Sequence, residues 1–143
     1  MKKIFFIIIF LLGLTQKGFA YSADPAQFIQ EIVNEAKEIL IESNSNEFKS
    51  KKLSEIALKT VDINGVAYYT LGKYRKQLSD KQMEEYLGLF EKYFLKSFTS
   101  RLTDYSDPKI DVISTKVVNP KYTIVKSLLL ATDKRPEVNI EWR

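Results

Sequence analysis

The stretch SDPKIDVISTKVV, residues 106–118, marks the point at which the chain changes from helix to strand. Before it, apolar residues recur every three or four positions, which is the spacing of an amphipathic helix. After it begins, the chain becomes dense in β-branched residues, which favour strands; these are Ile110, Val112, Ile113, Thr115, Val117 and Val118. The change predicts a strand over residues 109–118 and divides the chain into a helical part and a sheet part.

Four helices are predicted before this point, over residues 25–42, 47–60, 63–77 and 80–103. Local signals mark where three of them begin. Asp24-Pro25 and Asp62 provide N-caps, and Ser79-Asp80-Lys81-Gln82 fits a capping box. The fourth helix carries a broad stripe of large apolar side chains, formed by Met83, Tyr86, Leu87, Phe90, Phe94, Phe98 and Leu102.

Two further strands are predicted after residue 118. Asn119-Pro120 marks a turn, residues 122–131 form the second strand, and residues 133–136 form the next turn. Val138, Ile140 and Trp142 then alternate with polar residues, as in a strand with one buried face. The order of elements predicts an α+β fold in which N-terminal helices pack on one face of a twisted antiparallel sheet.

The third strand reaches Arg143 with no turn signal after it. A sheet that stopped there would expose an apolar edge, which folded proteins avoid. We therefore expect a further strand and helix beyond residue 143; the alternative is a natural end at Arg143.

The first twenty residues have the three parts of a signal peptide. Two lysines follow Met1, residues 4–14 are almost entirely apolar, and Gly18-Phe19-Ala20 places small residues at the two positions that signal peptidase reads. The alternative, a membrane anchor, needs about twenty apolar residues. We expect export and cleavage after Ala20, with Ala20-Tyr21-Ser22 as a second possible site, so that residues 21–143 form one soluble domain.

The charge balance of that domain argues against a nucleic-acid partner. Without Lys2, Lys3 and Lys17, 19 basic residues face 18 acidic ones. Nucleic-acid affinity depends on many charges that neutralise phosphates. The chain also contains no cysteine, so it has no disulfide to stabilise the domain and no site for a lipoprotein anchor.

The residue types present exclude several kinds of active site. Without His or Cys there is no Ser-His-Asp or Cys-His nucleophile and no ordinary zinc site. The glycines are not clustered into a phosphate loop. Carboxylate pairs, Asp62 with Glu85 or Asp104 with Asp107, are the remaining catalytic candidates, and helix caps and surface charges are the simpler interpretation. We therefore expect no enzyme activity.

A set of ordered motifs resembles the MlaC family of periplasmic phospholipid-binding proteins, related to toluene-tolerance components. Leu71-Gly72-Lys73-Tyr74, the basic Lys76 and Ser79-Asp80-Lys81-Gln82 are similar to the family's helix end and the start of its next helix. Its other segments are matched by Asp24-Pro25, Phe28-Ile29, Val61-Asp62-Ile63 with Ala67, and Phe90, Phe98, Leu102 and Tyr105. Arg75 departs from the pattern, because the family usually has an aromatic residue there.

The resemblance covers residues 24–143 and implies a function. It implies an apolar pocket between sheet and helices that takes phospholipid tails, with no cofactor and no metal. It also implies a shuttle between an inner-membrane ABC transporter complex and an outer-membrane lipoprotein–porin complex, which maintains the lipid asymmetry of the outer membrane. We expect a monomer.

Ten residues are predicted to line this lipid-binding pocket, namely Val66, Leu71, Phe90, Phe94, Ile124, Leu128, Leu130, Val138, Ile140 and Trp142. The same side chains would also fill an ordinary core, as in an envelope scaffold of similar fold without a lipid. A small hydrolase or isomerase on a related curved sheet is a third possibility. Lys73, Arg75 and Lys76 would meet a phosphate head group or an acidic partner, or form a solvated helix end.

Overall fold

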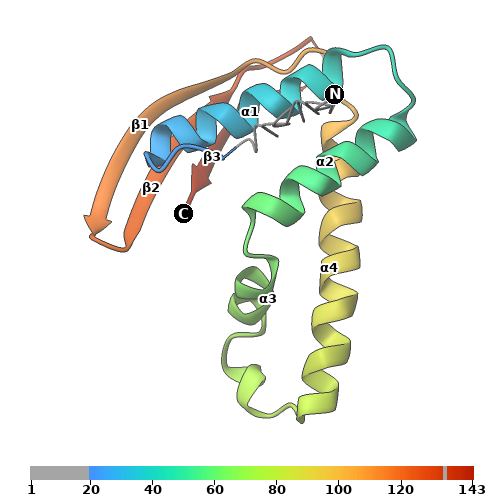
Figure 1. Cartoon of the computed structure of the whole chain (residues 1–143), viewed down its shortest axis with the longest axis vertical. Coiled ribbons are helices and arrows are strands. Elements are labelled where there is room, and N and C mark those ends of the chain that lie inside the picture. Colours follow the sequence, from blue (N-terminus) through green and yellow to red (C-terminus); the bar gives the residue numbers. More distant parts are fainter. Residues whose placement is uncertain (1–19, 134) are drawn as a thin grey trace, which may run out of the picture.

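The computed structural model describes residues 20–133 and 135–143 and confirms the α+β fold class (Figure 1). Its elements are α1 (Pro25–Ile41), α2 (Asn46–Thr60), α3 (Ile63–Leu71), the 3-10 helix η1 (Gly72–Lys76), α4 (Asp80–Leu102), β1 (Ile110–Asn119), β2 (Tyr122–Leu129) and β3 (Val138–Trp142). The predicted signal peptide, residues 1–20, lies outside the described residues except for Ala20. In the described part of the chain, no helix combines the length and the apolar character needed to cross a membrane.

The helices begin where the sequence predicts because local caps fix their first turns. An Asp24 side-chain oxygen accepts a hydrogen bond from the Gln27 N–H at 2.9 Å, and Asp62 accepts one from the Gly65 N–H at the same distance. Ser79 and Gln82 form the predicted capping box, in which the Ser79 N–H donates to the Gln82 side chain at 2.9 Å.

The prediction that the third helix continues to residue 77 was wrong at its C-terminal end. The α-helix stops at Leu71, because Gly72 adopts a φ of 52° that only glycine reaches without strain. The chain then tightens into η1, a single short 3-10 segment. The exposed basic residues that follow Gly72 therefore belong to a separate turn and not to α3.

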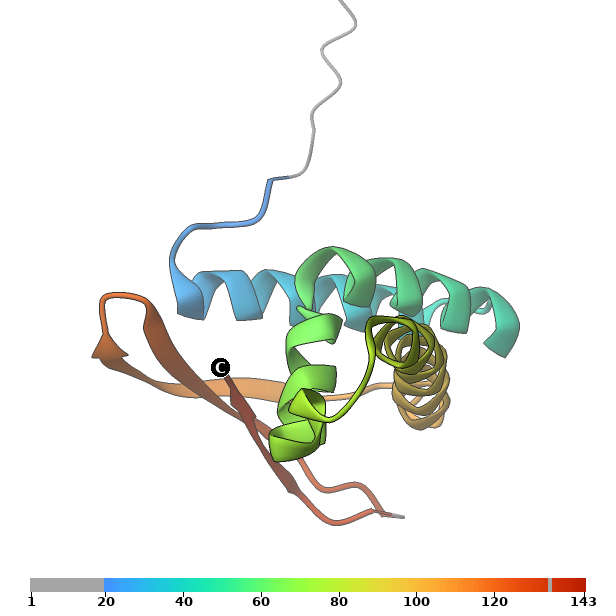
Figure 2. The same cartoon turned by 90° about the horizontal axis from the view of Figure 1, so that it is seen from below.

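The three strands pair antiparallel in the order β1-β2-β3, and the register of β1 shifts between Val112 and Ser114. Helix α1 packs on one face of the sheet, mainly against β1 and β2, with Ile29 and Val33 against Val125. Phe28, Ile110, Val112 and Trp142 surround this core. Figure 2 shows α1 and α2 on the same side of the sheet.

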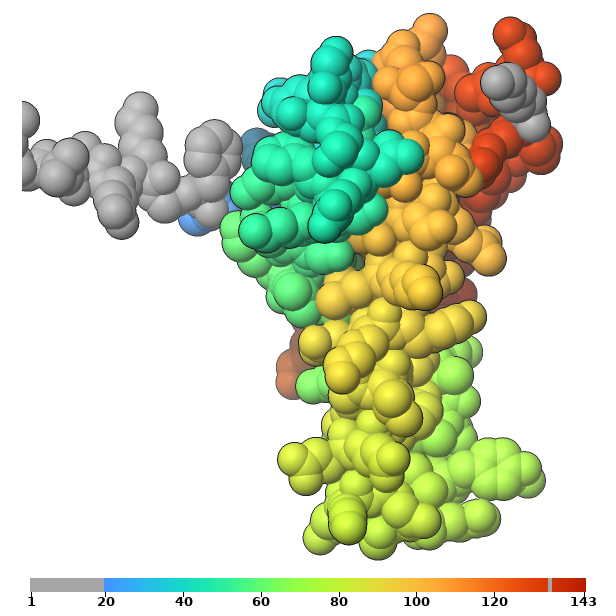
Figure 3. Space-filling view, turned by 90° about the vertical axis from the view of Figure 1, so that its right-hand side faces the viewer, coloured from blue at the N-terminus to red at the C-terminus, as the bar shows by residue number. Residues whose placement is uncertain are grey.

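Helix α2 connects this layer to the rest of the molecule. It contacts both α1 and α4, and its side chains Leu53, Ile56 and Ala57 are buried. Helix α3 packs against α4. We call α3, η1 and the N-terminal half of α4, residues 63–90, the arm, because they extend away from the sheet (Figures 1 and 3).

The segment before α1 is bound to that helix by hydrogen bonds and a ring contact. The Tyr21 hydroxyl donates to a Glu35 carboxylate oxygen at 2.5 Å, and its ring meets Phe28 edge-on with 5.5 Å between centroids. The Ser22 N–H donates to Glu31 at 2.8 Å. Burial, together with the hydrogen bond to the negative Glu35, raises the pKa of Tyr21 to about 12.

Candidate functional site

The longest aromatic surface of the described residues runs along α4. Tyr86, Phe90, Phe94 and Phe98 follow one another at four-residue spacing, and successive ring centroids lie 5.8, 6.3 and 5.9 Å apart. All four side chains are half-buried. We call these four residues the aromatic strip, a continuous apolar surface that the neighbouring elements cover only in part.

Helix α3 borders the lower end of the aromatic strip. The Tyr86 hydroxyl donates to the Ala67 carbonyl at 3.2 Å, and Ala67 is fully buried between the helices. Val66 and Leu71 are the predicted lining residues of α3. Val66 is exposed and Leu71 is half-buried, so neither is buried with Ala67.

Three predicted lining residues share the sheet face on which α1 lies. Val138, Ile140 and Trp142 pair in register with Leu129, Ser127 and Val125, and paired residues project to the same face. The Trp142 indole N–H donates to the Ser127 hydroxyl at 2.9 Å. Because α1 packs mainly on β1 and β2, Val138 stays 42% exposed and Ile140 is half-buried.

The other predicted strand residues lie elsewhere. Ile124 and Leu128 alternate with Val125 and project to the opposite face, as does Lys126, whose ammonium lies 3.3 Å from Glu141. Leu130 directly follows the end of β2. The predicted lining residues Ile124 and Leu128 of β2 therefore lie on the sheet face opposite the predicted lining residues of β3. None of the ten predicted lining residues is buried.

The residue that follows β3 forms an ion pair with a carboxylate of that strand, at 3.3 Å. Arg143 follows β3, and the Glu141 carboxylate that accepts its hydrogen bond raises the pKa of Arg143. Tyr122 and Tyr69 add smaller effects in the same direction.

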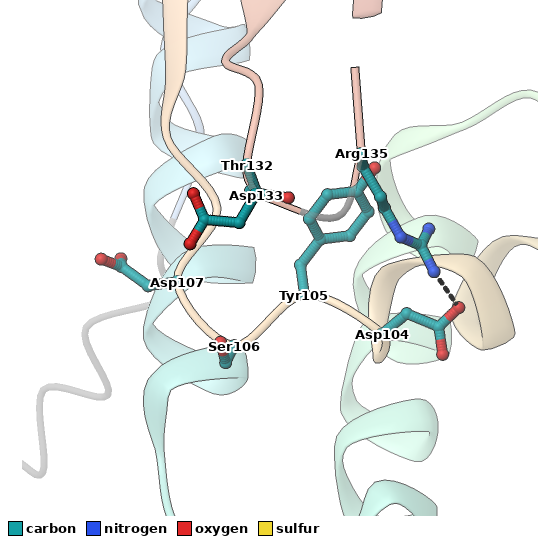
Figure 4. A pocket seen from close by; sticks show the side chains of 7 residues that line it. All are labelled: Asp104, Tyr105, Ser106, Asp107, Thr132, Asp133 and Arg135. Carbon is teal, nitrogen blue, oxygen red and sulfur yellow. Dashed lines mark hydrogen bonds and ion pairs between the residues drawn. The ribbon is translucent and has the colours of Figure 1, made fainter. Parts of the chain in front are cut away.

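A polar pocket of about 440 Å³ lies between two loops at the other end of the sheet (Figure 4). Its lining comes from the loop after α4 and the loop before β3, namely Asp104, Tyr105, Ser106, Asp107, Thr132, Asp133 and Arg135. Such a lining does not suit an acyl chain, which needs apolar walls. No group of three or more His, Cys, Asp or Glu side chains in the described part of the chain could hold a metal ion.

Arg135 contacts two other residues that line this pocket, Asp104 and Tyr105. Its guanidinium lies 2.6 Å from an Asp104 carboxylate oxygen and 4.8 Å from the centroid of the Tyr105 ring. The hydrogen bond with Asp104, helped by Tyr105, raises the pKa of Arg135. The cation therefore neutralises one carboxylate and stacks on a ring at the pocket edge.

The carboxylates considered as catalytic candidates have ordinary structural contacts. Asp104 pairs with Arg135, and Asp107 lies 3.6 Å from the Lys37 ammonium. Asp62 caps α3, and Glu85 is exposed on α4. The structure thus gives these side chains the contacts of caps and surface ion pairs.

Two members of the aromatic strip, Tyr86 and Phe98, were absent from the predicted lining although they belonged to the predicted helix stripe. The regular four-residue spacing through Phe90 and Phe94 was the signal that links them. Tyr93 and Leu89 add exposed apolar area beside the strip.

Comparison with known proteins gives one match. A family model described as MlaC protein matches residues 26–143, which include every helix and strand except the first residue of α1. No curated protein and no solved structure matches the chain.

Proposed function

The chain belongs to the MlaC family, and we propose that it is a periplasmic phospholipid carrier that moves lipid between the two membranes of a Gram-negative envelope. The family is a phospholipid-binding, transport-related family. The match over residues 26–143 is the observation that carries the proposal. The signal peptide predicted at residues 1–20 would export the chain to the compartment where such carriers work.

A carrier is required because free phospholipid does not cross water at a useful rate. Exposing a tail of about sixteen carbons to water costs roughly 12 kcal/mol, at about 0.8 kcal/mol per methylene. The protein must therefore offer the tails an apolar surface and leave the head group near solvent.

The partly covered apolar side chains support a location for this surface. The aromatic strip contributes Phe90 and Phe94, and α3 contributes Val66 and Leu71. Val138, Ile140 and Trp142 contribute the sheet face. We propose that acyl chains lie between these elements, and that Ile124, Leu128 and Leu130 contribute less directly, from the other face or the end of β2.

The partners of the carrier are also part of the proposal. We propose that lipid passes between an outer-membrane lipoprotein–porin complex and an inner-membrane ABC transporter complex, which maintains the lipid asymmetry of the outer membrane.

Native mass spectrometry with lipid fragmentation tests the proposal. The chain, expressed with its own N-terminus in a Gram-negative host, is purified from the periplasmic extract. We expect an added mass that fragments as a diacyl phospholipid. Val138→Asp should reduce the retained lipid more than tenfold, because a carboxylate placed against an acyl chain costs at least ~1.4 kcal/mol.

Val118→Asp is the matched control, since Val118 is also a strand valine and is 48% exposed against 42% for Val138. It should retain lipid as the unchanged protein does. Equal retention by both variants would show that the sheet face of β3 is not part of the site. A folded protein that carries no lipid and takes none from vesicles would overturn the carrier proposal in favour of an envelope scaffold.

A further inference from the structure

The end of the arm farthest from the sheet carries a concentration of basic residues. We call residues 72–81, η1 and the turn into α4, the tip (Figures 1 and 3). It contains Lys73, Arg75, Lys76 and Lys81 against one acidic residue, Asp80. All five side chains are exposed.

The basic side chains of the tip are close together in the chain and are not compensated by ion pairs. Other exposed cations, such as Lys51 and Lys92, are also without an ion pair among the described residues, but they are not concentrated in this way. Arg135, Lys126 and Arg143 each form an ion pair with a carboxylate. Within the described ranges, no ion pair involves Lys73, Arg75 or Lys76. The tip therefore presents uncompensated positive charge to whatever approaches it.

Exposed aromatic rings accompany these charges. Tyr74 is 57% exposed, and the Lys73 ammonium lies 5.5 Å from the centroid of its ring. Tyr69, at the end of α3 just before the tip, is 79% exposed. The favourable interaction of cations with a helix C-terminus accounts for basic residues here, but it does not account for exposed rings beside them.

We propose that the tip is a docking surface for the anionic face of a phospholipid bilayer. Lysine and arginine are attracted to anionic head groups, and tyrosine places its ring at the boundary between head groups and tails. The tip protrudes (Figure 3), so a flat surface can reach it without obstruction from the sheet. The inference rests on the proposed function for its purpose, because a lipid carrier has to approach a membrane.

The bilayer fits these observations better than an acidic protein. A protein partner gains affinity from pairing carboxylates with fixed cations, whereas lysine, arginine and tyrosine together are typical of interfacial anchors. The basic side chains of η1 also lie on one short turn at the end of the arm, which a plane can contact together.

Flotation with vesicles tests the docking surface. The protein purified from the periplasm is mixed with phosphatidylcholine vesicles that contain about one third phosphatidylglycerol, and with vesicles of phosphatidylcholine alone. We expect binding to the anionic vesicles only, and its loss at about 1 M salt, because salt screens exposed charges. Replacing three cations, in K73Q/R75Q/K76Q, should weaken binding about a hundredfold, or about fivefold per residue.

The matched control is K51Q/K92Q/R101Q, which removes two lysines and one arginine that are exposed on α2 and α4. It should bind within about twofold of the unchanged protein. Circular dichroism melting curves show whether both variants fold. Equal weakening in the two triple variants, or equal binding to neutral vesicles, would overturn the proposal. The proposal would also be overturned if the tip variant bound vesicles as well as the unchanged protein does but no longer bound an acidic protein of the envelope.

Lipid carried by the same preparations is measured by mass spectrometry. This separates the two proposals. Protein that retains phospholipid but does not float with anionic vesicles would contradict docking at the tip alone. Protein that floats through its tip but never carries lipid would contradict the carrier function alone.

Discussion

The hydrogen bond between Trp142 and Ser127 is predicted to hold the last strand against the middle of the sheet. The Ser127 side chain is 1% exposed, and its hydroxyl accepts the indole N–H at 2.9 Å. A neutral hydrogen bond contributes about 1 kcal/mol net to stability, and a buried group left without its partner loses about 1–3 kcal/mol. Trp142→Phe keeps an aromatic ring against Val125 but removes the donor, so we expect a loss of about 1–2 kcal/mol.

Ser127→Ala is expected to destabilise the protein less. It removes the acceptor, but the half-buried indole N–H can reach water, and the methyl side chain of alanine suits the apolar face. We expect a loss of about 0.5–1 kcal/mol. Once either partner is gone the bond is already broken, so the double variant should lose about 1 kcal/mol less than the sum of the single losses.

Urea unfolding followed by circular dichroism measures these four proteins. Fluorescence is unsuitable because Trp142 is the single tryptophan of the chain. Additive losses, within about 0.3 kcal/mol, would refute the reasoning, because they would mean that the two side chains do not act on each other. A change in the slope of the unfolding free energy against urea concentration would instead indicate that the variant alters the compactness of the folded or the unfolded state.

Two further predictions concern backbone and pH. The neutral Tyr21 hydroxyl is the donor to Glu35, and burial together with this hydrogen bond raises its pKa from the ordinary value of about 10 to about 12. The hydrogen bond should therefore contribute about 1–2 kcal/mol to the free energy of unfolding below about pH 10, and this contribution should be lost as the pH rises toward 12. Urea unfolding at about pH 8 and about pH 11 measures the change in that free energy, which should be smaller in Tyr21→Phe than in the unchanged protein. Gly72→Ala should lower the free energy of unfolding by about 1–2 kcal/mol through backbone strain alone, since Gly72 has a φ of 52° and an added Cβ would meet no other side chain or backbone within 4 Å. Gly88→Ala, in the middle of α4 with equal space, should raise it by about 0.5–1 kcal/mol. Equal shifts of the melting temperature in the two variants would contradict the strain argument.

The starts of the helices were predictable because their signals are local. Asp24, Asp62 and Ser79 each bond to a backbone N–H three residues ahead, so the sequence contains both partners within one turn. The end of α3 was not predicted. Glycine is tolerated inside a helix as well as after one, and its positive φ depends on where the chain must go next.

The faces of the strands were harder to predict than the strands themselves. Along β2 the buried face carries Val125, Ser127 and Leu129, so a serine stands at a core position while Ile124 and Leu128 project to the other side. Hydropathy alone favours neither face in Leu128-Leu129-Leu130. Ser127 belongs to the α1 face because it pairs with Ile140 and bonds to Trp142, which are contacts across the sheet.

The polar pocket was beyond sequence reasoning for a related reason. Arg135 and Asp104 stand 31 positions apart, and nothing in either segment indicates that the two loops meet. The antiparallel path from α4 through β1 and β2 brings the loop before β3 back beside the loop after α4. Contacts of this kind follow from topology, which the order of elements predicts only in outline.

The placement of buried and half-buried residues gives the proposed carrier a physical rationale. One tightly packed group joins α1 to the sheet through Ile29, Val33 and Val125, and α2 contacts both α1 and α4. The aromatic strip and β3 are each attached to one of these layers but leave part of their apolar surface uncovered. A protein that filled this region with its own side chains would gain hydrophobic stabilisation at about 25 cal/mol per Å² and lose any room for a ligand. Because these apolar side chains are partly exposed, a bound acyl chain can cover them and remove their surface from water. Such a ligand stabilises the folded state by mass action.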